Sequence, residues 1–122
     1  MADWKLGVVE SRFADIIWQN QPMSIKELVK RCETELEWKR TTTYTVLGRL
    51  ADRGLFKNEG GVVTACISRE EFYARQSEQY VEESFSGSLP MFLAAFTARK
   101  NLTADEVAEI RRLIDSYEEG LL

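Results

Sequence analysis

Residues 40–53 form the segment best suited to contact with a binding partner. Projected as a helix at about 100° per residue, the segment places Thr43, Val46, Leu47 and Leu50 on one apolar face. The opposite face and its flanks carry hydroxyls, a glycine, a guanidinium and a carboxylate, from Thr41, Thr42, Tyr44, Thr45, Gly48, Arg49 and Asp52. Threonine is a poor helix former, and glycine costs about 1 kcal/mol relative to alanine in a helix interior. This outer face adds little to stability but suits hydrogen bonding to phosphates and base edges in a DNA groove.

The local charge agrees with a contact to phosphates. The net charge of the chain is −4. Residues 39–57, however, contain five cations and a single carboxylate, that of Asp52. The cations are Lys39, Arg40, Arg49, Arg53 and Lys57. Such a cluster is what phosphate binding requires, although a charge cluster is more often a solvated surface.

The composition argues against an enzyme. The chain has no histidine, which removes the commonest general base and the commonest transition-metal ligand. Cys32 and Cys66 lie in apolar-patterned segments, where cysteine is usually a small buried hydrophobe. There are no paired acidic clusters and no phosphate-cradling glycine loop. We therefore expect no catalytic site, no metal and no cofactor.

The first half of the chain predicts three helices and a hairpin. The helices are expected at about residues 8–19, from Ser24 onward and at about 40–53, with Pro22 ending the first and Gly54 ending the third. Ser24 and Glu27 have the spacing of a capping box. Two β-prone runs joined through Gly60-Gly61 then predict a hairpin. This order indicates a winged helix-turn-helix domain over residues 1–67.

The second half predicts three helices, at about residues 68–84, at about 90–99 and from Thr103 onward. The run from Pro90 to Phe96 is apolar almost all round and must be enclosed on several sides. A second copy of the chain is the simplest enclosure, and packing back onto the first domain is the alternative. We therefore expect residues 68–122 to be a helical dimerisation domain. Its predicted contacts are Phe72, Tyr80, Leu89, Met91, Phe92, Leu93, Phe96, Ile110, Leu113, Ile114 and Tyr117. The predicted fold class is mainly α with a small β-hairpin wing.

No signal for export or membrane insertion is present. The first residues lack a basic region followed by an apolar run. The longest apolar stretch, residues 89–98, is far shorter than the roughly 20 residues that span a bilayer. The expected location is therefore the cytoplasm.

Several motifs together resemble the penicillinase-repressor family of winged-helix transcriptional regulators. Glu10 and Ile17-Trp18 match the family's first helix. The family's third-helix pattern is matched by Trp38, Thr42, Thr45, Arg49-Leu50 and Arg53-Gly54. Residues 85–89 and 102–106 resemble its dimerisation part. The resemblance covers about residues 6–119, and the third-helix pattern is long enough to be fairly specific.

The resemblance implies a homodimeric repressor whose third helix enters the major groove of a dyad-symmetric operator. By position, Thr42, Thr45 and Arg49 would contact DNA, and Thr41 and Tyr44 would be variable base-reading residues. The basic cluster adds Arg40 and Lys57 as candidate phosphate contacts. Other interpretations stay open: Thr42 as an ordinary helix-start residue, and Arg49 as a surface ion pair with Glu10 or Asp52.

Three departures from the family pattern bear on these expectations. Thr43 stands where the family prefers valine or isoleucine, so we expect its hydroxyl to bond back to the helix. The wing segment 61–66 lacks the basic residue and the aromatic of relatives, which leaves Lys57 as its cation. No cysteine follows Cys66, whereas the copper-responsive branch has a C-terminal cysteine cluster.

The β-lactam branch of the family also implies a way to release DNA. There, a membrane sensor-protease system triggers cleavage before a phenylalanine in the C-terminal part. The matching bond here is Ala95-Phe96, with alanine in place of that branch's asparagine. The competing functional hypothesis is a winged-helix protein-interaction module without specific DNA binding.

Overall fold

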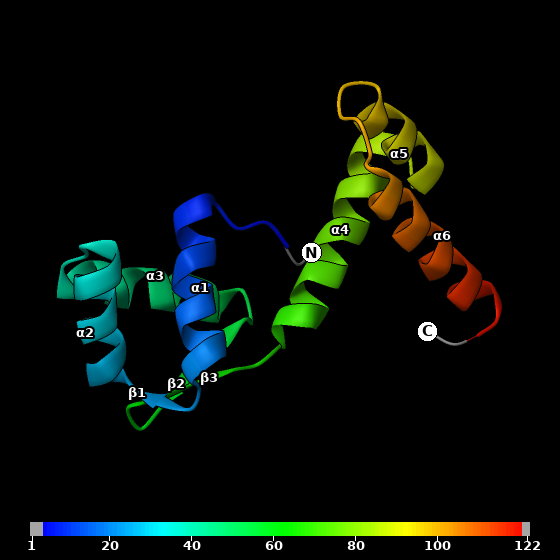
Figure 1. Cartoon of the computed structure of the whole chain (residues 1–122). Coiled ribbons are helices and arrows are strands. Elements are labelled where there is room, and N and C mark those ends of the chain that lie inside the picture. Colours follow the sequence, from blue (N-terminus) through cyan, green and yellow to red (C-terminus); the bar gives the residue numbers. More distant parts are fainter. Residues whose placement is uncertain (1–3, 121–122) are drawn as a thin grey trace. The chain divides into compact units, whose positions relative to one another are not determined.

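The computed structural model describes residues 4–120 and is mainly helical with one small sheet (Figure 1). In chain order the elements are α1 (Val8–Asn20), β1 (Met23–Ser24), α2 (Ile25–Leu36), α3 (Arg40–Asp52), β2 (Phe56–Glu59), β3 (Val62–Ala65), α4 (Arg69–Phe85), α5 (Leu89–Thr97) and α6 (Ala104–Glu118). This confirms the predicted fold class of a winged helix followed by a helical region. The chain forms two compact units, the first ending at Gln79 and the second beginning at Tyr80.

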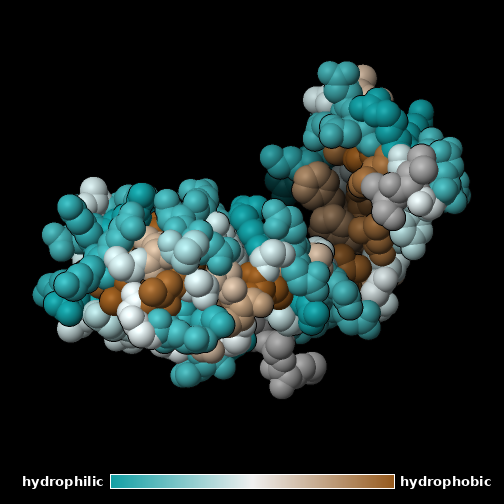
Figure 2. Space-filling model, turned by 90° about the horizontal axis from the view of Figure 1, so that it is seen from below, coloured by the Kyte–Doolittle hydropathy of each residue, from teal (hydrophilic) through white to brown (hydrophobic). Residues whose placement is uncertain are grey.

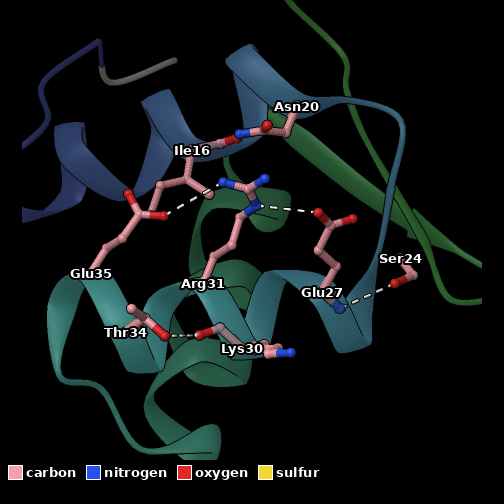
Figure 3. Close-up of polar contacts among 8 residues, drawn as sticks. All are labelled: Ile16, Asn20, Ser24, Glu27, Lys30, Arg31, Thr34 and Glu35. Carbon is pink, nitrogen blue, oxygen red and sulfur yellow. Dashed lines mark hydrogen bonds and ion pairs between the residues drawn. The ribbon is translucent and has the colours of Figure 1, made fainter.

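Side-chain caps begin several helices where the sequence placed them. At α2, Ser24 Oγ accepts from the Glu27 amide at 3.1 Å (Figure 3). The other half of the predicted capping box does not form there, because the Glu27 carboxylate accepts from Arg31 Nε at 3.2 Å instead. At α6 both halves are present: the Glu106 amide donates to Thr103 Oγ1 at 3.1 Å, and Glu106 Oε1 accepts from the Thr103 amide at 2.9 Å.

The wing is an antiparallel hairpin with a two-residue turn. β2 pairs with β3 in a register that sets Lys57 opposite Thr64. Gly60 and Gly61 form the turn with φ of 59° and 85°. Positive φ at both central residues fits the tight hairpin turn that follows strand twist, and glycine adopts it without steric cost.

A third strand, β1, extends this sheet in the order β1-β3-β2. Met23 pairs with Val63, and the Ile25 amide donates to the Gly61 carbonyl at 2.9 Å. The strand was not predicted, because two residues are too few to show alternating polarity. Its effect is to hold the wing turn against the start of α2.

The core of the first unit draws on every element from α1 to the start of α4. Its fully buried large side chains include Phe13, Ile17, Leu28, Leu50, Leu55, Phe56, Val63 and Phe72. Trp18 lies at the edge of this core, where its ring contacts those of Phe56 and Phe72 and its Nε1 donates to the Ile67 carbonyl at 3.0 Å. The first turns of α4 therefore belong with the winged helix.

Phe72 requires a correction to the predicted dimer contacts. Its exposed fraction is 0%, and its ring packs on Trp4, Trp18 and Tyr73. Because the winged-helix core already encloses Phe72, the side chain has no surface left for a second chain. The same packing explains why the first unit extends to Gln79 rather than ending at residue 67, where the sequence placed the domain boundary.

Thr43 lies in the core, as its place on the apolar face of α3 predicted, with an exposed fraction of 0%. The expectation that its hydroxyl bonds back to the helix is wrong: within residues 4–120, Oγ1 has no nitrogen or oxygen partner. The group beside it is the buried thiol of Cys32. Burial raises the pKa of that thiol, and the Thr43 hydroxyl partly opposes the rise.

Replacing Thr43 by valine is expected to stabilise the protein. A buried hydroxyl without a full hydrogen bond costs about 1–3 kcal/mol, and valine has nearly the same shape. We expect a gain of about 1 kcal/mol, which raises Tm by about 4–8 °C in a domain of 60–100 residues. Thermal unfolding followed by circular dichroism measures it. Thr45→Val, on the exposed face of α3, is the matched control and should leave Tm within about 2 °C. A lower Tm for Thr43→Val would show that the hydroxyl has a stabilising partner.

Candidate nucleic-acid interface and apolar C-terminal surface

The outer face of α3 is exposed as the helical projection predicted. Thr41, Tyr44, Thr45 and Gly48 are exposed, and Thr42 is half-buried. The opposite face, with Val46, Leu47 and Leu50, is buried. A Cβ built at Gly48 would meet no atom within 4 Å, so packing inside the protein does not require a glycine there. Because glycine has no side chain, the surface of α3 at position 48 lies close to the helix backbone.

The N-terminal end of α3 carries two cations and unpaired backbone amides. Its first turn contains no acidic residue, and no side chain caps it, since the N-cap residue is Lys39. Arg40 follows, with its guanidinium carbon 5.6 Å from the centre of the Tyr44 ring. Unpaired amides and the positive end of the helix dipole favour an anion at this end. Lys39 and Arg40 strengthen that preference, while Glu33 and Glu37, which line the same surface depression, oppose it.

Arg49 forms the ion pair with Glu10 that was considered from the sequence. Its Nη1 lies 3.4 Å from Glu10 Oε2, while the other oxygen of Glu10 accepts from the Gly7 amide at 3.1 Å. The Arg49 side chain stays 57% exposed. Exposed pairs of this kind contribute about 0–1 kcal/mol, and a guanidinium has five donors. The contact therefore orients Arg49 on the surface while most of its donors still face solvent.

Lys57 is the predicted contact that does not lie on α3. It sits on β2, where its Nζ is 2.9 Å from Glu59 Oε1. The hydrogen bond to Glu59 raises the pKa of Lys57, so the side chain stays a cation with an acidic neighbour. That neighbour lowers the net charge of the wing, as Glu10 lowers the charge beside Arg49.

Two further cations join the candidate interface. Lys39 is exposed at the start of α3, and Lys26 is exposed in the first turn of α2, next to the wing through the Ile25–Gly61 hydrogen bond. Among the described residues, neither is seen paired with a carboxylate. Lys39 belongs to the basic cluster found in the sequence. Lys26 was not predicted, because its position beside the wing depends on the pairing of β1 with β3. The outer side of α2 is by contrast balanced, since Arg31 lies 3.2 Å from Glu27 and 3.7 Å from Glu35 (Figure 3).

Residues 80–120, the described part of the second unit, have no closed core of their own. No residue from Tyr80 to Gly120 is buried. Its large hydrophobic side chains are at least 38% exposed at Tyr80, Leu89, Met91, Leu93, Phe96, Leu113, Ile114 and Tyr117. We call these eight residues the apolar C-terminal surface. Figure 2 shows apolar residues gathered in a hollow of this unit.

Local ring contacts give the second unit what internal packing it has. The Phe92 ring meets those of Tyr80, Phe85 and Phe96, with centroids 5.5–6.1 Å apart. Phe92 and Ile110 are each half-buried. All the predicted dimer contacts except Phe72 therefore keep apolar surface in the single chain.

The candidate cleavage bond lies on α5. Ala95 and Phe96 are both exposed, and Phe96 keeps 45% of its surface in solvent. Thr97, the last residue of α5, donates from its hydroxyl back to the Leu93 carbonyl at 2.8 Å. The bond is thus at the surface but within a hydrogen-bonded helix.

Within residues 4–120, no helix is both long and apolar enough to cross a bilayer. The same residues contain no group of three or more cysteine, aspartate or glutamate side chains arranged to hold a metal ion.

Comparison with known proteins agrees with this architecture. The sequence description of the penicillinase repressor family matches residues 6–116. The chain is also similar to the methicillin resistance regulatory protein MecI of Staphylococcus aureus, with 18% identity over 116 residues that cover 92% of this chain and 94% of MecI. The family match includes the winged helix, the exposed face of α3 and almost all of the apolar C-terminal surface. The chain belongs to the penicillinase repressor family of DNA-binding transcriptional repressors.

Proposed function

We propose that the chain is a homodimeric repressor that binds a dyad-symmetric operator through α3 in the major groove. The observation that carries this proposal is the outer face of α3, where hydroxyls, a glycine and Arg49 are exposed and no side chain caps the N-terminal end of the helix. Thr42, Thr45 and Arg49 anchor the helix, and Thr41 and Tyr44 read bases. Arg40 and Lys57 bind phosphates, with Lys26 and Lys39 beside them.

The second copy of the chain covers the apolar C-terminal surface. Eight large hydrophobic side chains at least 38% exposed, in a unit without a buried residue, favour an enclosing partner. A two-fold dimer is the commonest way to enclose such a surface, because the same patch then serves both chains. In such a dimer each α3 reads one half-site, with half-sites one helical turn, about 10 base pairs, apart.

Release of DNA follows from cleavage at Ala95-Phe96 by a system that a membrane sensor-protease controls. Cleavage there would separate Phe92 from Phe96, whose ring centroids are 6.0 Å apart, and would detach α6 from the rest of the chain. The apolar C-terminal surface has members on both sides of this bond. Loss of half of that surface weakens the dimer and, through it, operator binding.

Footprinting of the DNA upstream of the gene tests this proposal. Hydroxyl-radical protection should be symmetric about a dyad, with two protected major-groove segments about one helical turn apart. Complexes sized by light scattering should contain two chains per duplex. One chain per duplex, or no protection above that on scrambled DNA, would contradict the proposal. Absent protection together with a stable dimer would favour the protein-interaction module.

A further inference from the structure

Trp4 contacts α4, which lies about 70 residues further along the sequence, and the segment before α1 runs toward that helix (Figure 1). The Trp4 amide donates to Gln79 Oε1 at 3.0 Å. The Trp4 ring packs edge-on against Phe72, with centroids 5.8 Å apart, and the Arg75 guanidinium carbon lies 5.0 Å from its centre. One residue near the start of the chain thus contacts three positions along two turns of α4.

The same segment is fastened to the end of α3. Arg53, the residue that ends α3, donates from Nη2 to the Lys5 carbonyl at 2.6 Å. Leu6 packs against the hydrophobic core. We call residues 4–6 the N-terminal strap, because they join the end of the helix proposed to read DNA to the helix that continues into the second unit.

We propose that the N-terminal strap fixes the direction of α4 relative to α3 and so makes Trp4 and Arg53 determinants of operator spacing. This inference rests on the proposed function, since spacing has a meaning only when two chains read two half-sites. Neither residue belongs to the predicted DNA contacts.

The attachment of α4 explains why a strap is needed. The start of α4 is held by Phe72 in the core and by the ion pair of Arg69 Nε with Asp15 Oδ1 at 2.8 Å. A helix held only at its first turn can pivot there. Gln79 lies about 10 Å further along the helix at 1.5 Å per residue, and there Trp4 provides a second attachment. Two separated attachments define a direction.

A fixed direction has a consequence for DNA recognition. In a dimer joined through the second unit, α4 connects each reading helix to the dimer. If α4 is held, the two α3 helices are presented at one separation, and an operator with the wrong spacing forfeits the roughly 100-fold or greater gain of bivalent binding. If α4 pivots, operators of several spacings are accepted.

The test measures spacing preference with synthetic duplexes. Each duplex carries two copies of a half-site selected in vitro by the wild-type protein, at the selected spacing or with one or two base pairs inserted. Wild-type protein is expected to bind the altered duplexes at least about 10-fold more weakly, because each insertion displaces and rotates one half-site. Trp4→Ala and Arg53→Lys should discriminate less than about 3-fold while binding a single half-site as the wild type does.

A second measurement needs no DNA. Spin labels at Thr45 on α3 and Glu78 on α4, in a Cys66→Ser background diluted with unlabelled chain, report the distance between these helices. A narrow distribution in the wild type and a broad one in Trp4→Ala are expected. Val8→Ala, at an 81% exposed position close to the strap, is the matched control and should behave as the wild type.

Equal distance distributions in the wild type and Trp4→Ala would overturn the inference, as would wild-type spacing discrimination in that variant. Loss of single half-site binding in Trp4→Ala would also overturn it, because the strap would then be needed for the winged helix itself. If the wild type selects no half-site, the proposed function fails, and the distance distributions alone decide whether the strap holds α4.

Discussion

Replacing Leu113 by glutamate is expected to convert the proposed homodimer into a monomer and to lower operator affinity by about 100-fold or more. Leu113 lies on α6 and is 54% exposed in the single chain, so the substitution disturbs the single chain less than a change at a buried residue would. In the dimer, the same position would place a carboxylate among apolar side chains, where an unpaired charge is strongly unfavourable. The loss of affinity follows because each half-site would then be bound by an independent chain.

Sedimentation equilibrium gives the oligomeric state, and fluorescence anisotropy with an operator duplex gives the affinity. Arg112→Glu is the matched control, since it introduces a carboxylate at the next position of α6, on a face away from Leu113. It should leave the dimer intact. A Leu113→Glu protein that remains a dimer and binds with wild-type affinity would place the dimer interface elsewhere.

Replacing Arg49 by alanine is expected to lower operator affinity by about 10- to 100-fold, as loss of a direct arginine contact to DNA costs about 1–3 kcal/mol. Folding should change little. The pair that Arg49 makes with Glu10 is 3.4 Å long and exposed, and such pairs contribute at most about 1 kcal/mol. A large fall in affinity with an almost unchanged Tm therefore separates a DNA contact from a structural ion pair.

Arg31→Ala is the control for this experiment. Arg31 is also an arginine paired with a carboxylate, Glu27, at 3.2 Å, and it lies on the outer side of α2 rather than on α3. The two variants lose the same charge, so any general effect of net charge on DNA binding cancels. Equal affinities of the two variants would contradict a direct role for Arg49.

The sequence predicted the helices well because their signals are local. Ser24 and Thr103 accept backbone hydrogen bonds at the positions that capping motifs indicate, and the apolar face of α3 is the buried one. Gly60-Gly61 marked the turn of the wing. In each case the residues that decide the structure lie within a few positions of one another.

What the sequence did not predict depends on contacts between distant segments. β1 exists because Met23 meets Val63, and Phe72 is a core residue because α4 returns to α1. The N-terminal strap pairs Trp4 with Gln79 and Lys5 with Arg53. The sequence analysis placed Phe72 among the dimer contacts, because no local pattern distinguishes an apolar side chain of the winged-helix core from one that meets a second chain.

The candidate interface likewise has some features that local sequence patterns predicted and others that depend on contacts between distant segments. The exposed face of α3 followed from a helical projection, and the Arg49–Glu10 pair was one of two pairs considered from the sequence. The Lys57–Glu59 pair was not considered and needed coordinates. Lys26 came from the contact of α2 with the wing turn, for which no local pattern exists.

Binding of the purified protein to its own upstream DNA tests the central claim most directly. Fluorescence anisotropy would be recorded at several salt concentrations, with scrambled DNA as competitor. We predict binding by two chains per duplex, at least about 1,000-fold tighter than to scrambled DNA and steeply weakened by salt as phosphate contacts release counterions. Equal binding to both DNAs would contradict the account of α3 as a sequence-reading helix.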